Sequence, residues 1–530
     1  MSSRPRVKVA VVGSGLAGLT AAYRLCTSRS SKEFEVHLFE KANQLGMDSS
    51  SVTLDCGTKR RVDVPMRSFQ GGYYPNLIAL YKEIGVAFRA SDFTYSFSQL
   101  RPDRTFSTTL LYNGASGRAG LSMPSALRPH GKTRPGLFGS MDACLLWCLA
   151  WGFFVLSTLE LLWCQVRLCV LSAPWFRPDA LSTLTFEEWA SRTTPRGFVS
   201  RCIGLDQSWT TFVHDILVPL FSAICTAGSE DVLRHPVPEF LEYVWLTMFT
   251  HHYVAELGVR DVVARLARPI RHVHLSTNIS SFTRTSDGKV SVSATTLDSS
   301  GVETTETYGP FSHIIVATQA NQALPILDAY TSSLERDDPQ RASIALLRAP
   351  LAQFHYVPTI VINHADTSFL PAHASDVRDL NLVYAAPQAT CTSLPESDLC
   401  VPKSYAMATH VLQTPIAAQR LLQTTNPIIA PRRESVFSVA RLQRAVVTPE
   451  SKVALQSLAA LHATPRSWRN LWRSTETWSL GPAQGARSPD APGIWVCGSY
   501  AHGGIPLLEG CVVSARNVVD EIIRIQRTSC

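Results

Sequence analysis

One N-terminal unit constrains the fold of this chain more than any other part of the sequence. Residues 7–12 are an apolar run typical of a buried strand, and the turn Gly13-Ser14-Gly15-Leu16-Ala17-Gly18 follows directly. Residues 19–26 have helical spacing, and residues 34–40 form a second strand pattern that ends in an acid, Glu40. Strand, glycine turn, helix, strand and acid, in this order, predict a dinucleotide-binding α/β unit.

The chemistry of a bound dinucleotide explains these residue types. Gly13 permits a tight turn, Gly15 lets the backbone approach a diphosphate, and Gly18 lets the helix pack close to the strand. N–H groups at the start of the helix face the phosphates, and the acid accepts hydrogen bonds from the adenosine ribose. The predicted cofactor residues of this unit are Gly13, Ser14, Gly15, Leu16, Ala17, Gly18, Glu40 and the neighbouring Lys41.

A second segment, near the C-terminus, indicates which dinucleotide is bound. Residues 493–499 form a buried strand pattern ending in the turn Gly498-Ser499, and a helix pattern over residues 507–516 follows. This pair resembles the returning strand and helix of the flavin amine oxidase and phytoene desaturase superfamily, in which the helix start approaches the flavin ring. The resemblance implies FAD as the cofactor, with further contacts from Gly498, Ser499, Leu508 and Glu509.

The resemblance extends through the middle of the chain. Similarity to predicted FAD-binding amine-oxidase-like proteins, which are related to the flavoprotein part of plant cyclopropane fatty-acid synthases, covers residues 62–65, 74–77, 80–86 and 90–96. Residues 261–270 have a helix pattern, followed by strand patterns over residues 272–280 and 313–317. In the superfamily a residue at about Ile279 contacts the adenine. Residues 289–295 and 302–308 predict a hairpin beside this sheet.

One segment departs from the superfamily pattern. A basic residue usually follows Gly-Gly after the ribose acid, whereas this chain has Leu45-Gly46-Met47-Asp48. An acid there repels a diphosphate unless it is turned away or paired. Arg60, Arg61 and Arg67 are the available partners, and we include Arg67 among the predicted cofactor residues.

These patterns predict an α/β fold with two domains. The Rossmann-like FAD-binding domain is discontinuous and comprises residues 1–72, 236–330 and 482–530. An inserted α+β substrate domain comprises residues 73–235 and 331–481.

Composition excludes several other classes of protein. Of the 530 residues, 45% are hydrophobic and 17% charged, as in globular chains, and a net charge of +7 without a lysine tract argues against nucleic acid binding. The 13 cysteines form no paired metal-binding pattern, and we expect them to be reduced and no metal to be bound. Glycines interrupt the N-terminal apolar run, which argues against a signal peptide and for an intracellular protein, either cytoplasmic or membrane-associated.

The function expected from the resemblance is that of an FAD-dependent oxidoreductase of the amine oxidase or desaturase type. A small, lipophilic substrate would give hydride to flavin N5. The alternative is a flavin-binding or flavin-less scaffold or lipid carrier, because the same fold serves the non-enzymatic Rab escort and dissociation-inhibitor proteins.

Few residues are candidates for catalysis. His502, between the two C-terminal flavin motifs, is the candidate that we expect nearest the flavin. His251, His252 and Tyr253 could face a substrate cavity, whereas we interpret His364 with Asp366 as structural. Cys497 before the glycine turn is explained by packing rather than by covalent flavin attachment.

An apolar segment over residues 143–173 has three interpretations. Residues 143–159 contain no charged residue, a run slightly shorter than the roughly 20 residues of a spanning helix. The acid-free stretch before it carries Arg118, Arg128, Lys132 and Arg134. The segment is a buried helix of the substrate domain, a helix attached to one membrane face, or a membrane span.

Overall fold

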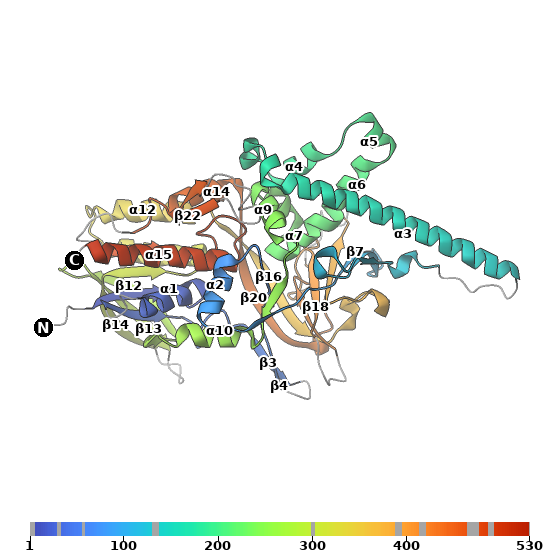
Figure 1. The fold of residues 1–530 in the computed structure, drawn as a ribbon. Coiled ribbons are helices and arrows are strands. Elements are labelled where there is room, and N and C mark those ends of the chain that lie inside the picture. The colour runs from blue at the N-terminus through green and yellow to red at the C-terminus, as the bar shows by residue number, and fades with distance from the viewer. Residues whose placement is uncertain are drawn as a thin grey trace.

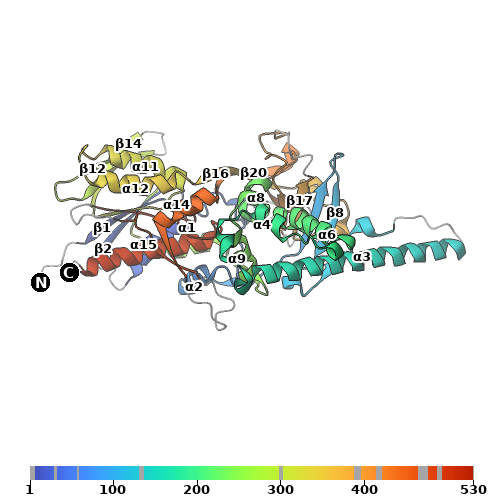
Figure 2. The same cartoon turned by 90° about the horizontal axis from the view of Figure 1, so that it is seen from above.

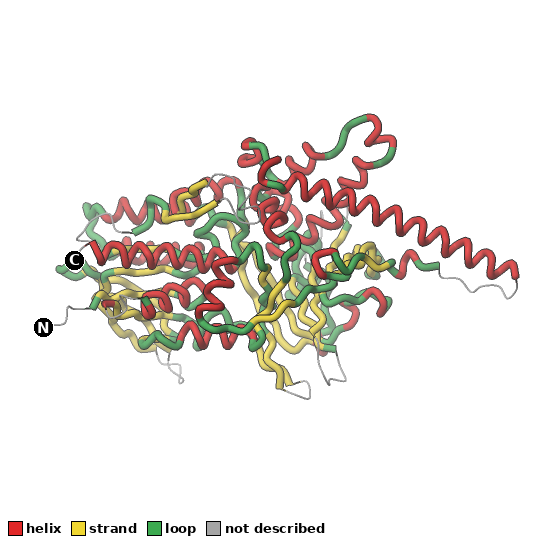
Figure 3. The backbone as a smooth tube through the Cα atoms, viewed as in Figure 1, coloured by secondary structure: helices red, strands yellow, loops and turns green. Residues whose placement is uncertain are grey.

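The structure is a computed structural model, and it describes residues 6–28, 33–55, 59–129, 137–297, 303–386, 395–412, 420–463, 476–485 and 492–528. Two main sheets lie beside each other, and one long helix, α3, projects from the molecule (Figures 1 and 2). Figure 3 shows that helices cover these sheets and form a layer of their own beside α3.

Five parallel strands form the first sheet, in the order β11-β2-β1-β15-β23. Successive side chains of a strand point to opposite faces. Val9 and Val11 of β1 therefore join the hydrophobic cluster on one face, while Ala10 and Val12 join the cluster on the other. The parallel order confirms the predicted α/β class. The strands are β1 (Val7–Val12), β2 (Phe34–Phe39), β11 (His272–His274), β15 (His313–Val316) and β23 (Gly493–Val496).

Four helices cover the first face: α1 (Leu16–Thr27), α2 (Pro75–Glu83), α10 (Gly258–Ala267) and α15 (Leu508–Thr528). The helices predicted over residues 19–26, 261–270 and 507–516 are confirmed, with shifted ends. α2 begins after residue 72, where we end the first segment of the FAD-binding domain. Its buried Leu77 and Leu80 nevertheless pack in the same cluster as α1 and α15.

The second face is covered by a three-stranded antiparallel sheet of β12 (Thr277–Arg284), β13 (Val290–Leu297) and β14 (Glu303–Phe311). The pairing of β13 with β14 confirms the predicted hairpin, whose turn lies outside the described residues. The single strand predicted over residues 272–280 is wrong. The strand is interrupted at Ser276, where φ is +50°, so β11 and β12 belong to different sheets.

Further elements on this second face are helices α11 (Ala320–Ser332), α12 (Gln340–Leu351) and α14 (Pro449–Leu458), and a hairpin of β21 (Ala459–Ala463) and β22 (Glu476–Leu480). Leu347 of α12 and Leu455 of α14 are buried in the same cluster as β1. The unit around the parallel sheet therefore extends past the predicted limits at residues 330 and 482.

The second main sheet has eight strands in the order β20-β16-β19-β18-β17-β7-β8-β9. Only the β17–β7 pair is parallel. Its strands are β7 (Tyr95–Leu100), β8 (Phe106–Tyr112), β9 (Leu121–Ser122), β16 (His355–His364), β17 (Leu380–Ala385), β18 (Met407–Leu412), β19 (Leu421–Thr425) and β20 (Val436–Val446). Smaller sheets pair β3 (Val52–Asp55) with β4 (Lys59–Val62), and β10 (His252–Ala255) with β5 (Phe69–Gln70) and β6 (Phe88–Ala90).

A helical layer packs against this second sheet. It contains α4 (Phe186–Thr193), α5 (Phe198–Cys202), α6 (Leu205–Phe212), α7 (Val218–Cys225), α8 (Ser229–Arg234) and α9 (Val237–Thr247), with a π-helical turn between α6 and α7. Buried aromatic side chains, among them Trp189, Trp209, Phe221 and Phe240, form its core.

Helix α3 (Leu137–Ser172) has two different parts. Cys164 and Leu168, toward its C-terminal end, are buried in the core of the helical layer. The preceding part extends beyond the rest of the molecule (Figure 1), and large apolar side chains from Leu145 to Leu159 are exposed. The interpretation as a buried helix therefore holds only for the C-terminal part.

Candidate cofactor and substrate site

The glycine turn lies between β1 and α1. A Cβ on Gly18 would lie 1.9 Å from the carbonyl oxygen of Gly13, so only glycine allows the helix to pack this closely. Around Gly15, in contrast, a Cβ would meet no atom within 4 Å. Since Gly15 also lines a large cavity, the turn presents bare backbone to whatever fills that cavity.

Glu40 lies beside this turn at the end of β2. Its Oε2 accepts hydrogen bonds from the backbone N–H of Ser14 at 2.9 Å and from the Ser14 hydroxyl at 2.6 Å. Its Oε1 accepts from the backbone N–H of Ala42 at 3.0 Å. The carboxylate thus joins the second strand to the turn. An ionised carboxylate accepts about four hydrogen bonds, so capacity for a ribose hydroxyl remains.

Asp48 is paired, which removes the expected repulsion. Its Oδ2 lies 2.7 Å from an Nη of Arg61 and 3.4 Å from Nε of Arg260. Arg61 is one of the three arginines that the sequence offers as partners of Asp48, whereas Arg260 is distant in the sequence and is not among them. Asp48 is 8% exposed and does not line the cavity.

Glu509 has a different position from the one that the resemblance implies. Its Oε1 accepts from the backbone N–H of Asn76 at 3.0 Å and from the amide of that side chain at 2.6 Å. Its Oε2 accepts from the N–H of Leu77 at 2.9 Å. Glu509 therefore caps the first turn of α2, which has no capping side chain of its own. Burial raises the pKa of this carboxyl.

The large cavity has a volume of about 930 Å³ and lies between the two main sheets and the helical layer. Five of the predicted cofactor residues line it: Gly15, Leu16, Arg67, Ser499 and Leu508. The glycine turn and the start of α15, from opposite ends of the chain, therefore meet one continuous space. The other predicted residues do not line it: Gly13, Ser14, Ala17, Gly18, Glu40, Lys41, Ile279, Gly498 and Glu509.

Two arginines give the cavity its positive charge. Burial lowers the pKa of Arg67 to about 10, and it also lowers the pKa of Arg444 on β20. Arg444 donates from Nε to the Thr226 hydroxyl at 3.2 Å, and Nε of Arg67 has no partner among the described residues. Neither arginine forms an ion pair with a described carboxylate. A desolvated cation of this kind favours an anionic ligand.

The remaining polar side chains on the cavity wall are mostly uncharged at neutral pH. Burial lowers the pKa of His252, and it lowers that of His410 to about 4. A ring nitrogen of His252 lies 2.7 Å from the side-chain nitrogen of Gln70. His252 thus faces the cavity as the sequence allows, while His251 instead pairs with Asp92 at 2.7 Å.

Other sequence candidates lie away from this cavity. The ring of His502 packs edge-on against Trp478, and burial lowers its pKa to about 4, so its proximity to the flavin stays a prediction. His364 bonds the Thr424 hydroxyl at 2.8 Å and Asp366 pairs with Arg432, so both side chains have partners within the protein. Cys497 is fully buried and does not line the cavity.

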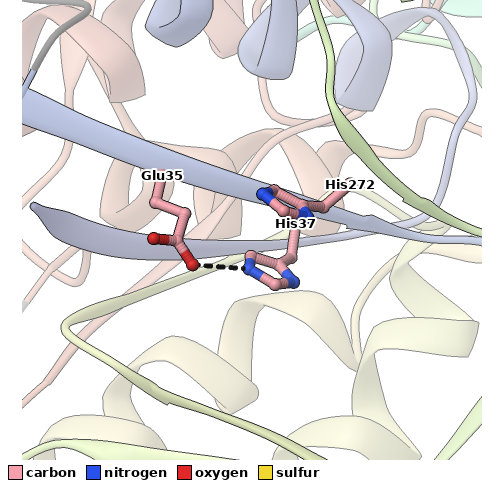
Figure 4. Close-up of side chains that lie close together, drawn as sticks. All are labelled: Glu35, His37 and His272. Atoms are coloured by element: carbon pink, nitrogen blue, oxygen red, sulfur yellow. Dashed lines mark hydrogen bonds and ion pairs between the residues drawn. The ribbon is translucent and has the colours of Figure 1, made fainter.

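Glu35, His37 and His272 form a separate cluster at the edge of the parallel sheet (Figure 4). Their potential metal-ligating atoms lie within 4.8 Å of one another, and Nε2 of His37 is 3.1 Å from Oε1 of Glu35. The two imidazole rings are stacked, with centroids 4.4 Å apart and planes 6° apart. Because a metal lies in the plane of its imidazole ligand, these rings do not converge on one ion, and we assign no metal to them.

Sequence reasoning missed several residues of the site. Arg444, Tyr74, Tyr243 and Gln423 all line the cavity. The exposed and half-buried residues of β20 alternate, which indicates a strand but not which face meets a cavity. No sequence signal separates Arg444 from Arg441 on the same strand, although Arg441 pairs with Asp398 in the structure.

Comparisons with known proteins agree with this geometry. Residues 11–84 match a family model described as an NAD(P)-binding Rossmann-like domain. A search of curated proteins found no match.

Solved structures resemble the whole chain. A protein from an Exiguobacterium strain, assigned as a protoporphyrinogen oxidase, has 14% identity and a TM-score of 0.51, with 99% of this chain and 100% of that one covered. Cyclohexylamine oxidase from Brevibacterium oxydans has 11% identity and a TM-score of 0.50 at coverages of 99% and 100%. An oxidoreductase from Methanosarcina mazei has 12% identity and a TM-score of 0.51 at coverages of 97% and 100%.

The chain therefore has a Rossmann-like dinucleotide-binding domain within an overall fold that resembles amine and protoporphyrinogen oxidases. At these identities the likeness establishes the fold. The narrower link to the flavoprotein part of plant cyclopropane fatty-acid synthases finds no support in these comparisons.

Proposed function

We propose that this protein is an FAD-dependent oxidoreductase that oxidises a lipophilic small molecule. One observation supports this most strongly: a single cavity reaches both the glycine turn at Gly15 and the start of α15 at Leu508. A Rossmann domain that bound a nucleotide alone would not need the second contact. A dinucleotide whose reactive ring extends into an enclosed space uses both.

The residues present fit such a cofactor. Gly15 offers backbone with free space around it, and Glu40 lies next to the turn where the second strand ends. Ser499 and the first residue of α15 form the opposite wall, where a helix N-terminus favours negative charge. Arg67 and Arg444 offer positive charge that no described carboxylate neutralises. FAD, when bound, supplies the electron acceptor that amino acid side chains lack.

The substrate part of the cavity is largely apolar. Its wall includes Phe97, Leu110, Leu220, Leu382 and Ala408, and tyrosines are among the polar residues that line it. Hydride from a substrate C–H bond is the form in which we expect the electrons to leave, since a dry, apolar wall disfavours charged intermediates. Side chains of the second sheet and of the helical layer would orient the substrate and exclude water.

The test begins with the absorption spectrum of the purified, FAD-supplemented protein. We expect flavin bands, and we expect acid precipitation to release the flavin because the binding is noncovalent. Gly15→Val should abolish FAD binding without unfolding the protein, since φ at Gly15 is −62° and its Cβ position is free. The branched side chain would occupy the space that the diphosphate needs.

Gly152→Val is the matched control, because a Cβ at Gly152 also meets no atom within 4 Å and this glycine does not line the cavity. It should bind FAD like the wild type. A folded wild-type protein that stays colourless would contradict the proposal and support a scaffold without cofactor. Stoichiometric FAD in the Gly15→Val variant would show that the cofactor lies elsewhere.

A further inference from the structure

We propose that α3, together with α5, inserts into one leaflet of an anionic phospholipid bilayer, and that the cavity takes its substrate from that leaflet. The entry of substrate from the leaflet rests on the proposed function, whereas the insertion of α3 and α5 does not. α3 contains one of two helices in the described chain that are long and apolar enough to cross a membrane. The other covers residues 205–225, and 44% of its most apolar 18-residue stretch is buried inside the protein. The corresponding stretch of α3 is 0% buried.

The exposed part of α3 is apolar around its whole circumference. Exposed side chains follow one another along the sequence at Leu145, Leu146, Trp147, Leu149 and Trp151. Successive residues of a helix differ by about 100° in direction, so this run leaves no polar face. A protein partner covers one stripe of a helix, whereas lipid chains surround it. Glu160 is the only charged residue between Asp142 and Arg167.

A second apolar element lies close to α3. Phe198, Val199 and Ile203, in and next to α5, are exposed, Phe198 to 83%. α6 packs against both α5 and α3, and α5 and α6 lie on the side of the helical layer away from the parallel sheet (Figure 1). The exposed Arg196 and Arg201 flank these apolar side chains, as suits an anionic lipid surface.

The connection before α3 disfavours a span. Ser125 is held to the protein by hydrogen bonds to the buried Asp376, at 2.6 Å from hydroxyl to carboxylate. At the other end of α3, Arg167 donates to the carbonyl oxygen of Thr193. If α3 spanned, Leu137 would lie across the bilayer while Pro129 stayed on the near side. Fully extended, the chain from 129 to 137 reaches about 29 Å at most. That barely equals a hydrocarbon core of about 30 Å, and a fully extended connection would leave its backbone groups unpaired in the lipid.

The cavity meets this helix. Leu161, Leu162, Gln165 and Leu168 of α3 line it, and Leu162 is also 57% exposed. A side chain that belongs to both the cavity wall and the apolar surface marks a place where the two are continuous. A lipophilic substrate dissolved in the leaflet would therefore reach the cavity without crossing water.

Flotation of the full-length holoprotein with vesicles of phosphatidylcholine and phosphatidylserine tests the insertion. We expect the protein to float and to remain bound in 1 M NaCl, because apolar contacts are insensitive to salt. A variant with Leu149→Glu, Phe153→Glu and Leu156→Glu should lose at least tenfold in bound fraction. These side chains are exposed, so its thermal unfolding midpoint and FAD content should match the wild type.

Val453→Glu is the matched control, since this apolar side chain is 67% exposed and belongs to α14, which packs on the parallel-sheet unit rather than beside the exposed part of α3. It should float like the wild type. A wild-type protein that stays with the soluble fraction, alone or as a dimer, overturns the proposal, and so does equal flotation of the triple variant. Release by salt would show surface attraction without insertion. Colourless protein that floats would overturn only the proposed function.

Labelling of Lys132 separates one leaflet from a span. Lys132 is the only lysine between Lys82 and Lys289, so its peptide is identified by mass spectrometry. A membrane-impermeant amine reagent added outside sealed vesicles should label it to the same extent as Lys82. Labelling that appears only after detergent would place residue 132 in the lumen and overturn the one-leaflet arrangement.

Discussion

At the scale of single residues, the most informative side chain is Glu509, because it connects two segments that lie 433 positions apart. A buried carboxylate that caps a helix is held by three hydrogen bonds, and its loss leaves two backbone N–H groups of α2 unpaired. Glu509 is the second residue of α15, and Leu508, the first, lines the cavity. Its role is therefore to position two walls of the site rather than to exchange protons with a substrate.

Glu509→Ala should lower the free energy of unfolding by about 2–4 kcal/mol, the cost of several unpaired buried groups. Glu509→Gln should lower the free energy of unfolding less. The amide oxygen of glutamine can still accept a hydrogen bond from one backbone N–H, whereas its NH₂ group cannot accept one from the other. Urea unfolding followed by circular dichroism measures both. Glu521→Gln, on the exposed face of the same helix, is the control and should change little. A larger loss in Glu509→Gln than in Glu509→Ala would contradict the capping role.

Arg67 can be tested at the same scale. Arg67→Met keeps the length of the side chain but removes an unneutralised charge from the cavity wall. If an anionic group binds there, FAD should dissociate at least tenfold more readily, as measured by fluorescence of released flavin. Arg61→Met, which removes the partner of Asp48 outside the cavity, should affect protein stability more than FAD affinity. Unchanged FAD retention in Arg67→Met would exclude a contribution of this charge to cofactor binding.

At the scale of elements, the edge of the parallel sheet carries an unusual stack of histidines. His37 on β2 stacks on His272 and lies 5.3 Å, centroid to centroid, from His274 on β11. Burial lowers the pKa of His37, and burial with the neighbouring histidines lowers that of His274 to about 4. Glu35 on the same strand as His37 faces this stack, and so do Lys8, Phe311 and Glu306 from other strands. Beside the backbone pairing of β2 with β11, Nδ1 of His37 lies 3.1 Å from Nε2 of His274, so these two side chains also join the strands.

The stability of the folded protein should fall as the pH is lowered from about 6.5 to about 4. A histidine with a lowered pKa in the folded state contributes no pH dependence above the unfolded value of about 6.5. Below it the unfolded chain takes up protons first, so stability is lost between about pH 6.5 and pH 4. The thermal unfolding midpoint should decrease over this interval, and His274→Phe should make the decrease smaller. An unchanged pH dependence in that variant would exclude a contribution of His274.

The elements also show what the sequence can and cannot predict. β1, α1 and β2 follow from apolar runs and glycines because their hydrogen bonds and packing are local. The hairpin of β13 and β14 follows for the same reason. The division between β11 and β12 depends on Ser276, where no glycine signals the positive φ. The cap of α2 by Glu509 and the charge of Arg444 depend on contacts between distant segments, which periodicity does not reveal.

At the scale of the whole molecule, the predicted classification as α/β is confirmed, and the site combines both main sheets. The predicted FAD-binding domain contained the first sheet but omitted α2, α12 and α14, which pack against its two faces. The sequence patterns of these three helices are weak. Only the burial of their side chains in the two clusters assigns them to this unit. The cavity arises because the chain passes between the two sheets several times, so neither half forms the site alone.

The strand order of the first sheet also has a consequence for biosynthesis. β1 is complete after 12 residues, but its neighbour β15 ends at Val316 and the outer strand β23 at Val496. At about 5–20 residues per second, roughly half a minute to a minute and a half separates the first strand from the last on the ribosome. During that interval β1 lacks its neighbour β15, and α3 is complete at Ser172 long before the last strand of the sheet is made. The parallel sheet is therefore completed only when β23 has been made, long after β1.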